Sequence, residues 1–414
     1  MIRYILTASL LILVSLTCAS QKDPGKSYLE KTGVVDILYS EILNENREIY
    51  IELPDGFQNN GSQQYPVVYI LDGEVLLPTV KNVQSFYSGG FTPEMILVGI
   101  SNAENRVRDL TTSTINEKYG MPFNEENGKA EAFLQFMEKE LIPFIENKYP
   151  VTQFRTLIGH SYGGLFTIYS LIHHPELFSN YLAIDPSLDW DDQKLLEESN
   201  TKLATQDYKG KSLFMSLNGQ LSMLDPEMTL ENVVKDSTDF TVFPRSNIAF
   251  ADMVREHSAN ELDFDWKFYP RDLHGTIAFP SIMDGMIATF DWYQMENTDK
   301  FNSPETSNEE LFEIVKYRAQ KLEDRFGYQV APYPEELLTI LGDMSLDMEQ
   351  FEKSKMFLDF SLEYYPESSS PYHFMSKYYE STGDFEKALE FATKAYELNP
   401  DDTYKSRMES LKRQ

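Results

Sequence analysis

Nearly continuous apolar runs are the feature that most limits how this chain can fold. Two of them, at 66–73 and 94–100, are apolar at almost every position, which is typical of central parallel strands that are covered on both faces. Helical stretches such as 129–148 separate runs of this kind throughout residues 33–297. The alternation predicts a doubly wound, mostly parallel α/β sheet. The other strand-like runs are 34–40, 47–54, 155–158, 181–187, 211–217 and 263–270.

The sequence GHSYGG at 159–164 joins one of these runs to a helix-like stretch. A chain that turns directly from a strand into a helix is crowded at the corner, and Gly159, Gly163 and Gly164 relieve that crowding. A serine at the corner has an exposed hydroxyl, and the N–H groups that begin the helix can stabilise an oxyanion beside it. The same glycines would suit an ordinary turn, but the strand before them and the helix after them favour Ser161 as a nucleophile.

A serine hydroxyl needs a base to remove its proton, and histidine has a suitable pKa. Of the six histidines in the chain, His274 fits this role best. It lies in the loop RDLHGT, after the strand predicted at 263–270, and it comes last in the chain order Ser, acid, His. The other five lie beside the elbow, with the side chain expected to point away, or in helical stretches: His160, His173, His174, His257 and His373.

The acid of a triad is expected after the strand that lies between the serine and the histidine, which is 211–217. The loop that follows offers Asp225, our choice, and Glu227 as the next candidate. Asp185 follows a different strand and Asp272 is only two residues from the histidine, so both are weaker candidates. A Ser–His pair without an acid is a further alternative.

Two backbone N–H groups are expected to form the oxyanion hole. One belongs to Tyr162, at the start of the helix after the elbow. The other is expected in the turn after YILDG, at Gly73 or Glu74.

Arg108 lies in the stretch RVRD, which follows the central strand predicted at 94–100. This is the side on which α/β sheets bind ligands. Arg108 is therefore a candidate for binding an anionic or catecholate group of a substrate, and an Arg–Asp surface pair is the alternative.

Residues 1–20 have the pattern of a secretory signal peptide, with Arg3 near the start and an apolar run that is too short to span a membrane. Cys18 is the single cysteine of the chain. Either it is acylated, which would tether the protein to a membrane as a lipoprotein, or cleavage occurs after Ala19 or Ser20. Residues 21–32 are expected to form a polar tether. The expected location is the periplasm or, with a lipid anchor, the cell envelope.

The composition changes near residue 298, where a polar linker at 298–308 is expected to lead into a helical region at 309–414. The segment 371–402 fits the 34-residue tetratricopeptide pattern, with a less regular copy before it. Such helix pairs bury their faces by stacking, and they are candidates for binding a protein partner. The positions that fit the pattern are Tyr372, Tyr379, Gly383, Ala388, Ala395 and Pro400.

The net charge of −30 argues against a nucleic-acid partner, which would require a basic surface. The sequence contains no Cys/His cluster with metal-ligand spacing and no nucleotide-binding loop. We therefore expect neither a metal nor an organic cofactor, and the expected partner is a small-molecule substrate.

Residues of about 35 to 295 resemble the putative esterase family of α/β-hydrolases, which includes the enterochelin esterases. The resemblance rests on five stretches in order: 69–74, 98–113, 133–150, 158–166 and 269–276. It implies that Ser161 is the nucleophile and His274 the base, with an oxyanion hole at Tyr162 and near Glu74. Two places depart from the family pattern, namely 184–190, where ISPSLWW is common, and the long loop after 217.

The resemblance implies a secreted serine esterase that hydrolyses a siderophore lactone or a carbohydrate ester through an acyl-enzyme. Two alternatives are an acyltransferase that uses the same site and a non-catalytic scaffold whose repeats bind a protein. Retention of both Ser161 and His274 favours an enzyme.

Overall fold

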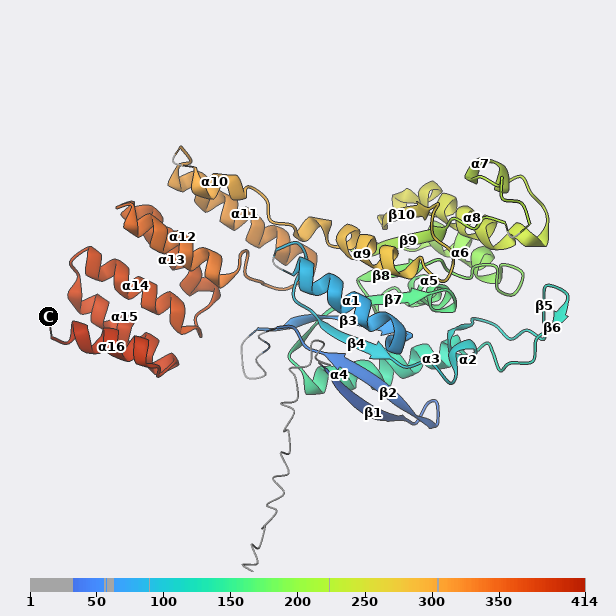
Figure 1. Ribbon diagram of the computed structural model, residues 1–414, viewed down its shortest axis with the longest axis horizontal. Helices are drawn as coiled ribbons and strands as arrows, with labels where there is room; N and C mark the ends of the chain where they lie inside the picture. Colours follow the sequence, from blue (N-terminus) through green and yellow to red (C-terminus); the bar gives the residue numbers. More distant parts are fainter. Residues whose placement is uncertain are drawn as a thin grey trace, which may run out of the picture.

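The protein consists of a large α/β unit followed by a stack of helices (Figure 1). The computed structural model describes residues 33–413 apart from 56, 58–62, 89, 223 and 304. The signal peptide predicted at 1–20, its Cys18 and the tether predicted at 21–32 lie outside the described residues. Among the helices that are described, none is long and apolar enough to cross a membrane.

An eight-stranded sheet forms the centre of the α/β unit, in the order β1-β2-β4-β3-β7-β8-β9-β10. The β1–β2 and β2–β4 pairs are antiparallel and the remaining pairs are parallel. The prediction of a mostly parallel α/β sheet is confirmed. The strands are β1 (Val34–Ser40), β2 (Glu45–Glu52), β3 (Tyr65–Leu71), β4 (Ile96–Ile100), β7 (Val151–His160), β8 (Asn180–Ile184), β9 (Ser212–Asn218) and β10 (Asp263–Tyr269).

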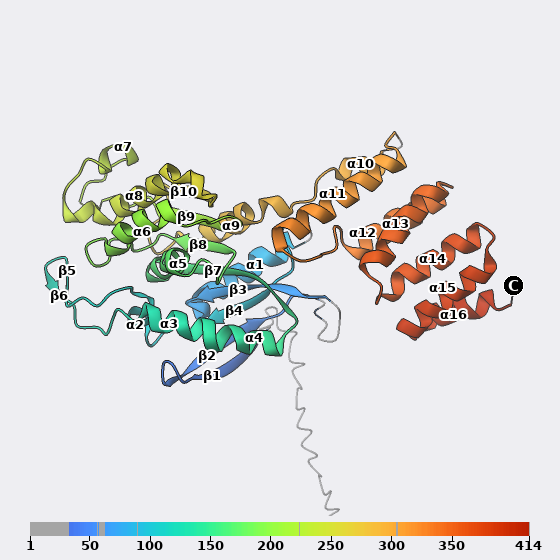
Figure 2. The same ribbon diagram turned by 180° about the vertical axis from the view of Figure 1, so that it is seen from behind.

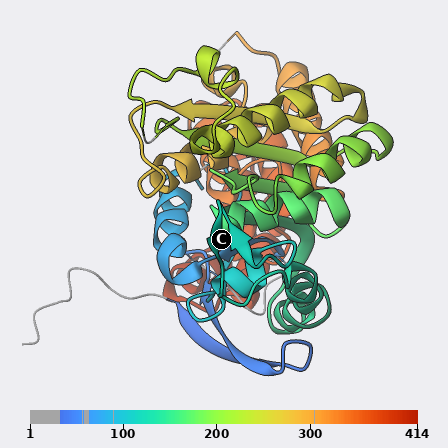
Figure 3. The ribbon, with the colours of Figure 1, turned by 90° about the vertical axis from the view of Figure 1, so that its right-hand side faces the viewer.

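The central strands are buried on both faces, and successive side chains of a strand point to opposite sides. On β3, Tyr69 and Leu71 pack on one face, while Val68 and Ile70 pack on the other. Figure 3 shows α1 on one side of the sheet and α3 and α5 on the other. The helices of the first face are α3 (Ala130–Phe136), α4 (Ile142–Lys148), α5 (Tyr162–His173), α6 (Lys194–Thr205) and α8 (Val242–Glu256); those of the second are α1 (Gly73–Tyr87) and α9 (Ala278–Thr289).

Several short elements lie at the carboxyl edge of the sheet or connect the larger helices. The helix predicted at 129–148 forms as α3 and α4, which are joined without a gap by a π-helical turn at Met137–Leu141. A small hairpin of β5 (Glu117–Lys118) and β6 (Met121–Pro122) was not expected from the sequence. The remaining short helices are α2 (Arg106–Leu110), α7 (Leu230–Val233) and the 3-10 turns Asp239–Thr241, Ser258–Asn260 and Asp291–Tyr293.

Residues 308–411 form antiparallel helices that stack at one end of the molecule (Figure 2). Ala388 and Ala395, two of the predicted repeat positions, are buried between these helices. Gly383 turns the chain between two of them with a φ of 83°. The helices are α11 (Asn308–Phe326), α12 (Glu335–Asp347), α13 (Phe351–Tyr364), α14 (Ser369–Ser381), α15 (Phe385–Leu398) and α16 (Asp402–Leu411).

The α/β unit and the helical stack share buried side chains. Leu322 and Phe326 of α11 belong to the apolar cluster beneath the α1 and α9 face of the sheet. The Phe326 ring lies 4.9 Å from that of Phe154. The segment that the sequence assigned to a linker, 298–308, contains α10 (Thr298–Asn302), and its Phe301 is buried in the core of the stack.

Candidate active site

Ser161 lies between the end of β7 and the start of α5, at the carboxyl edge of the sheet. Its φ of 61° places it in a region that non-glycine residues rarely adopt. A side chain at Gly159 would overlap the carbonyl group of Gly163, and a Cβ at Gly164 would lie 2.9 Å from the backbone of Pro186. Gly159 and Gly164 are therefore required because the strand, the helix and the next loop approach closely.

The structure brings Ser161 and His274 together. His274 lies in the turn between β10 and α9, and its Nε2 is 2.9 Å from the Ser161 hydroxyl. This distance is suitable for proton transfer from the hydroxyl to the imidazole. The two residues are separated by more than a hundred positions in the sequence, and the parallel strands bring them to the same edge.

Asp185, and not Asp225, completes the arrangement. The Oδ2 atom of Asp185 lies 2.6 Å from Nδ1 of His274. The carboxylate is fully buried, and it also accepts hydrogen bonds from the backbone N–H and the side-chain amide of Asn218, at 3.0 and 2.6 Å. Ser161, His274 and Asp185 thus form a hydrogen-bonded chain, an arrangement that suits a nucleophile, a base and an orienting acid.

The assignment of the acid to Asp225 is corrected by this geometry. Asp225 is exposed, and its Oδ1 accepts a hydrogen bond from the backbone N–H of Glu227, at 2.9 Å, within the same loop. Glu227 is exposed as well, and Asp272 accepts from the hydroxyl of Thr276. The loop after β9 leads to α7, and Asn218, the last residue of β9, contacts Asp185.

One sequence signal pointed to Asp185. It follows the buried strand β8 directly, at the position where the related family commonly has a serine, and a carboxylate at such a place must find partners. Its φ of 47° turns the chain so that the side chain faces His274. From the sequence Asp185 is nevertheless the weaker candidate, because the acid is expected after the next strand.

His160 also contacts the site, although its side chain was expected to point away. Its ring centroid lies 4.7 Å from that of His274, and its Nε2 is 2.9 Å from the His274 carbonyl oxygen. Burial, assisted by the neighbouring His274, lowers the pKa of His160 to about 4. His160 is therefore neutral near pH 7, and its ring N–H can hold the loop of His274 in place.

His160, Asp185 and His274 place potential metal-ligand atoms within 4.8 Å of one another. However, both ring nitrogens of His274 are engaged, with Asp185 on one side and Ser161 on the other. The Nε2 of His160 is likewise within hydrogen-bonding distance of a carbonyl oxygen. The donor set therefore fits a hydrogen-bonded triad better than a metal site.

The predicted oxyanion donors lie at the starts of two helices, α5 and α1. Tyr162 is the first residue of α5, and Glu74 is in the first turn of α1, with its side chain exposed. A Cβ at Gly163 would lie 3.6 Å from the carboxylate of Asp72, so the turn after β3 packs against the start of α5. The first N–H groups of each helix have no partner within the helix, and the roles of Tyr162 and Glu74 stay predictions.

Arg106 stabilises the turn between β3 and α1. Its guanidinium forms a two-point ion pair with Asp72, at 2.8 and 2.9 Å. It also donates a hydrogen bond to the carbonyl oxygen of His160, 3.0 Å away. One side chain thus links the turn before α1 to the strand that carries the serine.

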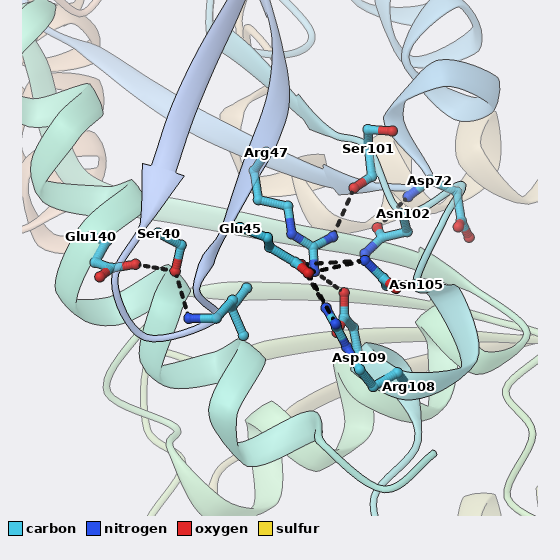
Figure 4. A network of polar contacts seen from close by, with 11 residues as sticks. Ser40, Glu45, Arg47, Asp72, Ser101, Asn102, Asn105, Arg108, Asp109 and Glu140 are labelled. Carbon is cyan, nitrogen blue, oxygen red and sulfur yellow. Dashed lines mark hydrogen bonds and ion pairs between the residues drawn. The ribbon is translucent and has the colours of Figure 1, made fainter. Parts of the chain in front are cut away.

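Arg108, the predicted substrate-binding residue, is already paired inside the protein. Figure 4 shows its guanidinium in a polar network with Glu45 and Asp109. The distances to the two carboxylate oxygens of Glu45 are 3.0 and 2.6 Å. These partners raise the pKa of Arg108 above its usual range. The prediction is corrected: the guanidinium nitrogens of Arg108 bond to Glu45 and Asp109, so the alternative of an Arg–Asp pair is the one observed, with Glu45 as a further partner.

Comparisons with known proteins agree with this architecture. Residues 40–222 match the family model described as Putative esterase, and residues 369–402 match a tetratricopeptide repeat model. The second match covers α14 and α15. The chain therefore contains a recognised repeat in the region where the 34-residue pattern was noted.

Two esterases are similar to part of this chain. The ferri-bacillibactin esterase BesA of Bacillus subtilis is 32% identical over 173 residues, which cover 38% of this chain and 60% of that protein. The siderophore triacetylfusarinine C esterase of Aspergillus fumigatus is 28% identical over 163 residues, covering 36% and 53%. The chain thus spans between half and two thirds of the length of these two relatives.

A solved structure extends the likeness further along the chain. The IroE-like serine hydrolase from Shewanella oneidensis is 30% identical, with a TM-score of 0.65, and the match covers 80% of this chain and 99% of that one. The chain belongs to the Putative esterase family of α/β-hydrolases and carries tetratricopeptide-like repeats at its C-terminal end.

Proposed function

We propose that this protein is a serine esterase that hydrolyses carboxylic esters through an acyl-enzyme. The observation that carries the proposal is the continuous chain of hydrogen bonds from Ser161 through His274 to the buried Asp185. Membership of an esterase family supports the same reaction. Two of the similar proteins are the ferri-bacillibactin esterase and the siderophore triacetylfusarinine C esterase, and we propose siderophore esters as the substrate class to test first.

The reaction begins when Nε2 of His274 accepts the hydroxyl proton of Ser161, and the serine oxygen attacks the ester carbonyl. The N–H of Tyr162 and a donor in the turn near Glu74 stabilise the negative charge on the carbonyl oxygen. The protonated imidazole donates a hydrogen bond from its Nδ1–H to Asp185. It then transfers the Nε2 proton to the departing alcohol. A water molecule, activated in the same way, releases the acid and restores the free serine.

Export follows from the pattern of residues 1–20, which supports a location outside the inner membrane, with or without acylation of Cys18. The repeats at the C-terminal end are candidates for binding a protein partner. Neither role is required for the chemistry at Ser161.

A fluorophosphonate probe tests the nucleophile directly, because it forms a stable adduct only with an activated serine. We expect one adduct, on Ser161, which disappears in Ser161→Ala. Ser187 provides a sharp control, since its hydroxyl lies 3.4 Å from that of Ser161. Ser187→Ala should retain the adduct. An adduct on Ser187, or full ester turnover by Ser161→Ala, would refute the assignment.

A further inference from the structure

The predicted oxyanion hole has two halves, the turn at 72–74 and Tyr162 at the start of α5. The guanidinium of Arg106 contacts both of them. Its Nε and Nη2 atoms lie 2.8 and 2.9 Å from the two carboxylate oxygens of Asp72, and its Cζ lies 5.5 Å from the centroid of the Tyr162 ring. The same Nη2 group donates to the carbonyl oxygen of His160, the residue before the proposed nucleophile, at 3.0 Å. Arg106 therefore joins the turn before α1 to the elbow.

The backbone of the turn at 72–74 is held in an unusual conformation. Asp72 has a φ of 51°, which a non-glycine residue adopts only when its surroundings enforce it. Its N–H donates to Oδ1 of Asn102, at 3.1 Å (Figure 4), and a Cβ at Gly73 would lie 2.5 Å from the backbone of β4. Its carboxylate is anchored by Arg106, which engages both oxygens. Because the N–H groups of the turn follow Asp72 directly, their directions depend on how Asp72 is held.

The other half depends on the end of β7. Ser161 also has a left-handed φ, 61°, and its N–H donates to the carbonyl oxygen of Ile184, at 2.9 Å. The His160 carbonyl oxygen, one peptide earlier, accepts from Arg106, and the Tyr162 N–H follows one peptide later. Stabilisation of an oxyanion requires both donors to point at one place, and a displacement of about 1 Å can lower the rate by about 100-fold. The separation of the two halves is therefore critical.

We propose that Arg106 is a positioning residue of the oxyanion hole, which fixes the N–H donor of the 72–74 turn relative to that of Tyr162. The inference rests on the proposed esterase activity and concerns the same site. Arg106 acts through Asp72 and His160, and its planar guanidinium suits this task because it presents several N–H donors in fixed directions. A lysine is a point charge, so it can neutralise Asp72 but cannot reproduce the two-point ion pair.

Two variants test the proposal with p-nitrophenyl butyrate as the substrate. Arg106→Met removes the guanidinium and keeps an apolar stem, and it should lower kcat/KM by a factor of about 10–100. The loss should appear in kcat with little change in KM, because oxyanion contacts strengthen in the transition state. Arg106→Lys keeps the charge beside Asp72 and should show a smaller loss, which keeps the test valid if circular dichroism shows that Arg106→Met folds poorly.

A tetrahedral inhibitor separates positioning from a general effect on the fold. Butylboronic acid adds to the serine hydroxyl and places an oxygen in the oxyanion hole, as the transition state does. Its Ki should rise by about the same factor as kcat/KM falls. The pH midpoint of kcat/KM should stay unchanged, because Ser161, His274 and Asp185 keep their contacts.

A double-variant cycle tests the ion pair itself. Asp72→Asn removes the charge that Arg106 contacts, and asparagine tolerates the left-handed backbone of this position. Each single variant disrupts the same bridge, so Arg106→Met/Asp72→Asn should lose no more kcat/KM than the more damaging single variant. Full additivity would mean that the two residues act independently, and it would contradict the proposal.

Arg155→Met is the matched control. Arg155 lies on β7, the strand that ends at His160, and it also bonds a carboxylate and a backbone carbonyl oxygen, those of Glu146 and Leu177. Its loss should lower stability, as the loss of Arg106 does. It should leave kcat/KM and the Ki of butylboronic acid within about twofold of wild type, because none of these contacts involves the elbow or the 72–74 turn.

The inference would be overturned if kcat/KM and Ki stayed within about twofold of wild type in folded Arg106→Met, or in Arg106→Lys where Arg106→Met does not fold. A rise in KM at unchanged kcat would also overturn it, since that result would indicate binding of the ground state. So would a shifted pH midpoint, which would indicate an effect on His274 through His160. Absence of fluorophosphonate labelling and of ester turnover in the wild-type protein would instead refute the esterase proposal, so the two failures are distinguishable.

Discussion

The loops after β8 and β9 start from neighbouring parallel strands, yet they differ in almost every physical respect. The β8 loop begins with Asp185, which is fully buried and bonded to His274 and Asn218. The β9 loop carries Asp225, which is exposed and bonded to its own backbone. Both offer an aspartate at the carboxyl edge of the sheet, but only the first is positioned by buried donors.

The difference shows that the position of an acid in a triad depends on what holds it, as much as on which strand precedes it. Asn218 is the last residue of β9, and it contributes two N–H donors to Asp185 of the adjacent strand. The β9 strand therefore still takes part in the site, as the partner of the acid. We expect variants of the two loops to separate these roles.

Replacing Asp185 should have the largest effect. In Asp185→Asn the amide would face Nδ1 of His274 and favour the wrong tautomer, which lowers kcat by a factor of about 10³–10⁴ in comparable triads. The measurement is kcat for p-nitrophenyl acetate, with circular dichroism to check folding. Turnover within about tenfold of wild type would indicate that the Ser161–His274 pair works without an acid.

Asn218→Ala should have an intermediate effect. It removes the side-chain donor to Asp185 and leaves the backbone N–H in place. A hydrogen bond to a charged group is worth about 1.5–3 kcal/mol, and a loss of that size in the transition state corresponds to about a 10- to 150-fold lower kcat.

A fall in kcat at constant KM would identify Asn218 as a positioning residue that acts through Asp185, the residue to which its amide donates. Asn232→Ala is the matched control, because Asn232 caps α7 in the exposed β9 loop. A larger loss in Asn232→Ala than in Asn218→Ala would contradict the contrast between the two loops.

Most of the α/β fold could be predicted from the sequence because the central strands are buried on both faces and because Gly159 and Gly164 have no room for a side chain. Ser161 and His274 could be found for the same reason: one lies in a motif and the other was isolated by elimination. The acid could not, since its identity depends on the register of β8 against β9, which places Asn218 beside Asp185. The same holds for Arg108, whose partner Glu45 is 63 residues away in the sequence.

His160 provides a smaller test, on stability. Its pKa is about 4 in the folded protein and about 6.5 when unfolded, so the folded state binds the proton less well than the unfolded state. The contribution is fully present above about pH 6.5 and is lost as the pH falls to about 4. We expect the free energy of unfolding to decline over this range by about 1–2 kcal/mol more than in His160→Gln, after allowance for partial solvent screening.

Urea unfolding at several pH values measures this difference, and Gln is chosen because its amide can still donate to the carbonyl group of His274. His257→Gln is a suitable control, since His257 lies at the exposed end of α8. Parallel stability curves for wild type and His160→Gln would show that His160 titrates normally in the folded protein.

Asp225→Asn should have the smallest effect of all. The side chain is exposed and accepts a hydrogen bond from Glu227 in its own loop, and an asparagine oxygen can accept the same bond. Surface changes of this kind alter stability by less than about 0.5 kcal/mol, and kcat should stay within about twofold of wild type.

The comparison is sharpest when Asp225→Asn and Asp185→Asn are assayed side by side with a small ester and a bulky one. If Asp225→Asn were damaging for the bulky ester alone, the β9 loop would contact the substrate without belonging to the triad. If it were damaging for both esters while Asp185→Asn was mild, the β9 loop would have to close over the site during catalysis and exchange its acid for that of the β8 loop. The three hydrogen-bonding contacts of the Asp185 carboxylate, two from Asn218 and one with His274, make that exchange unfavourable.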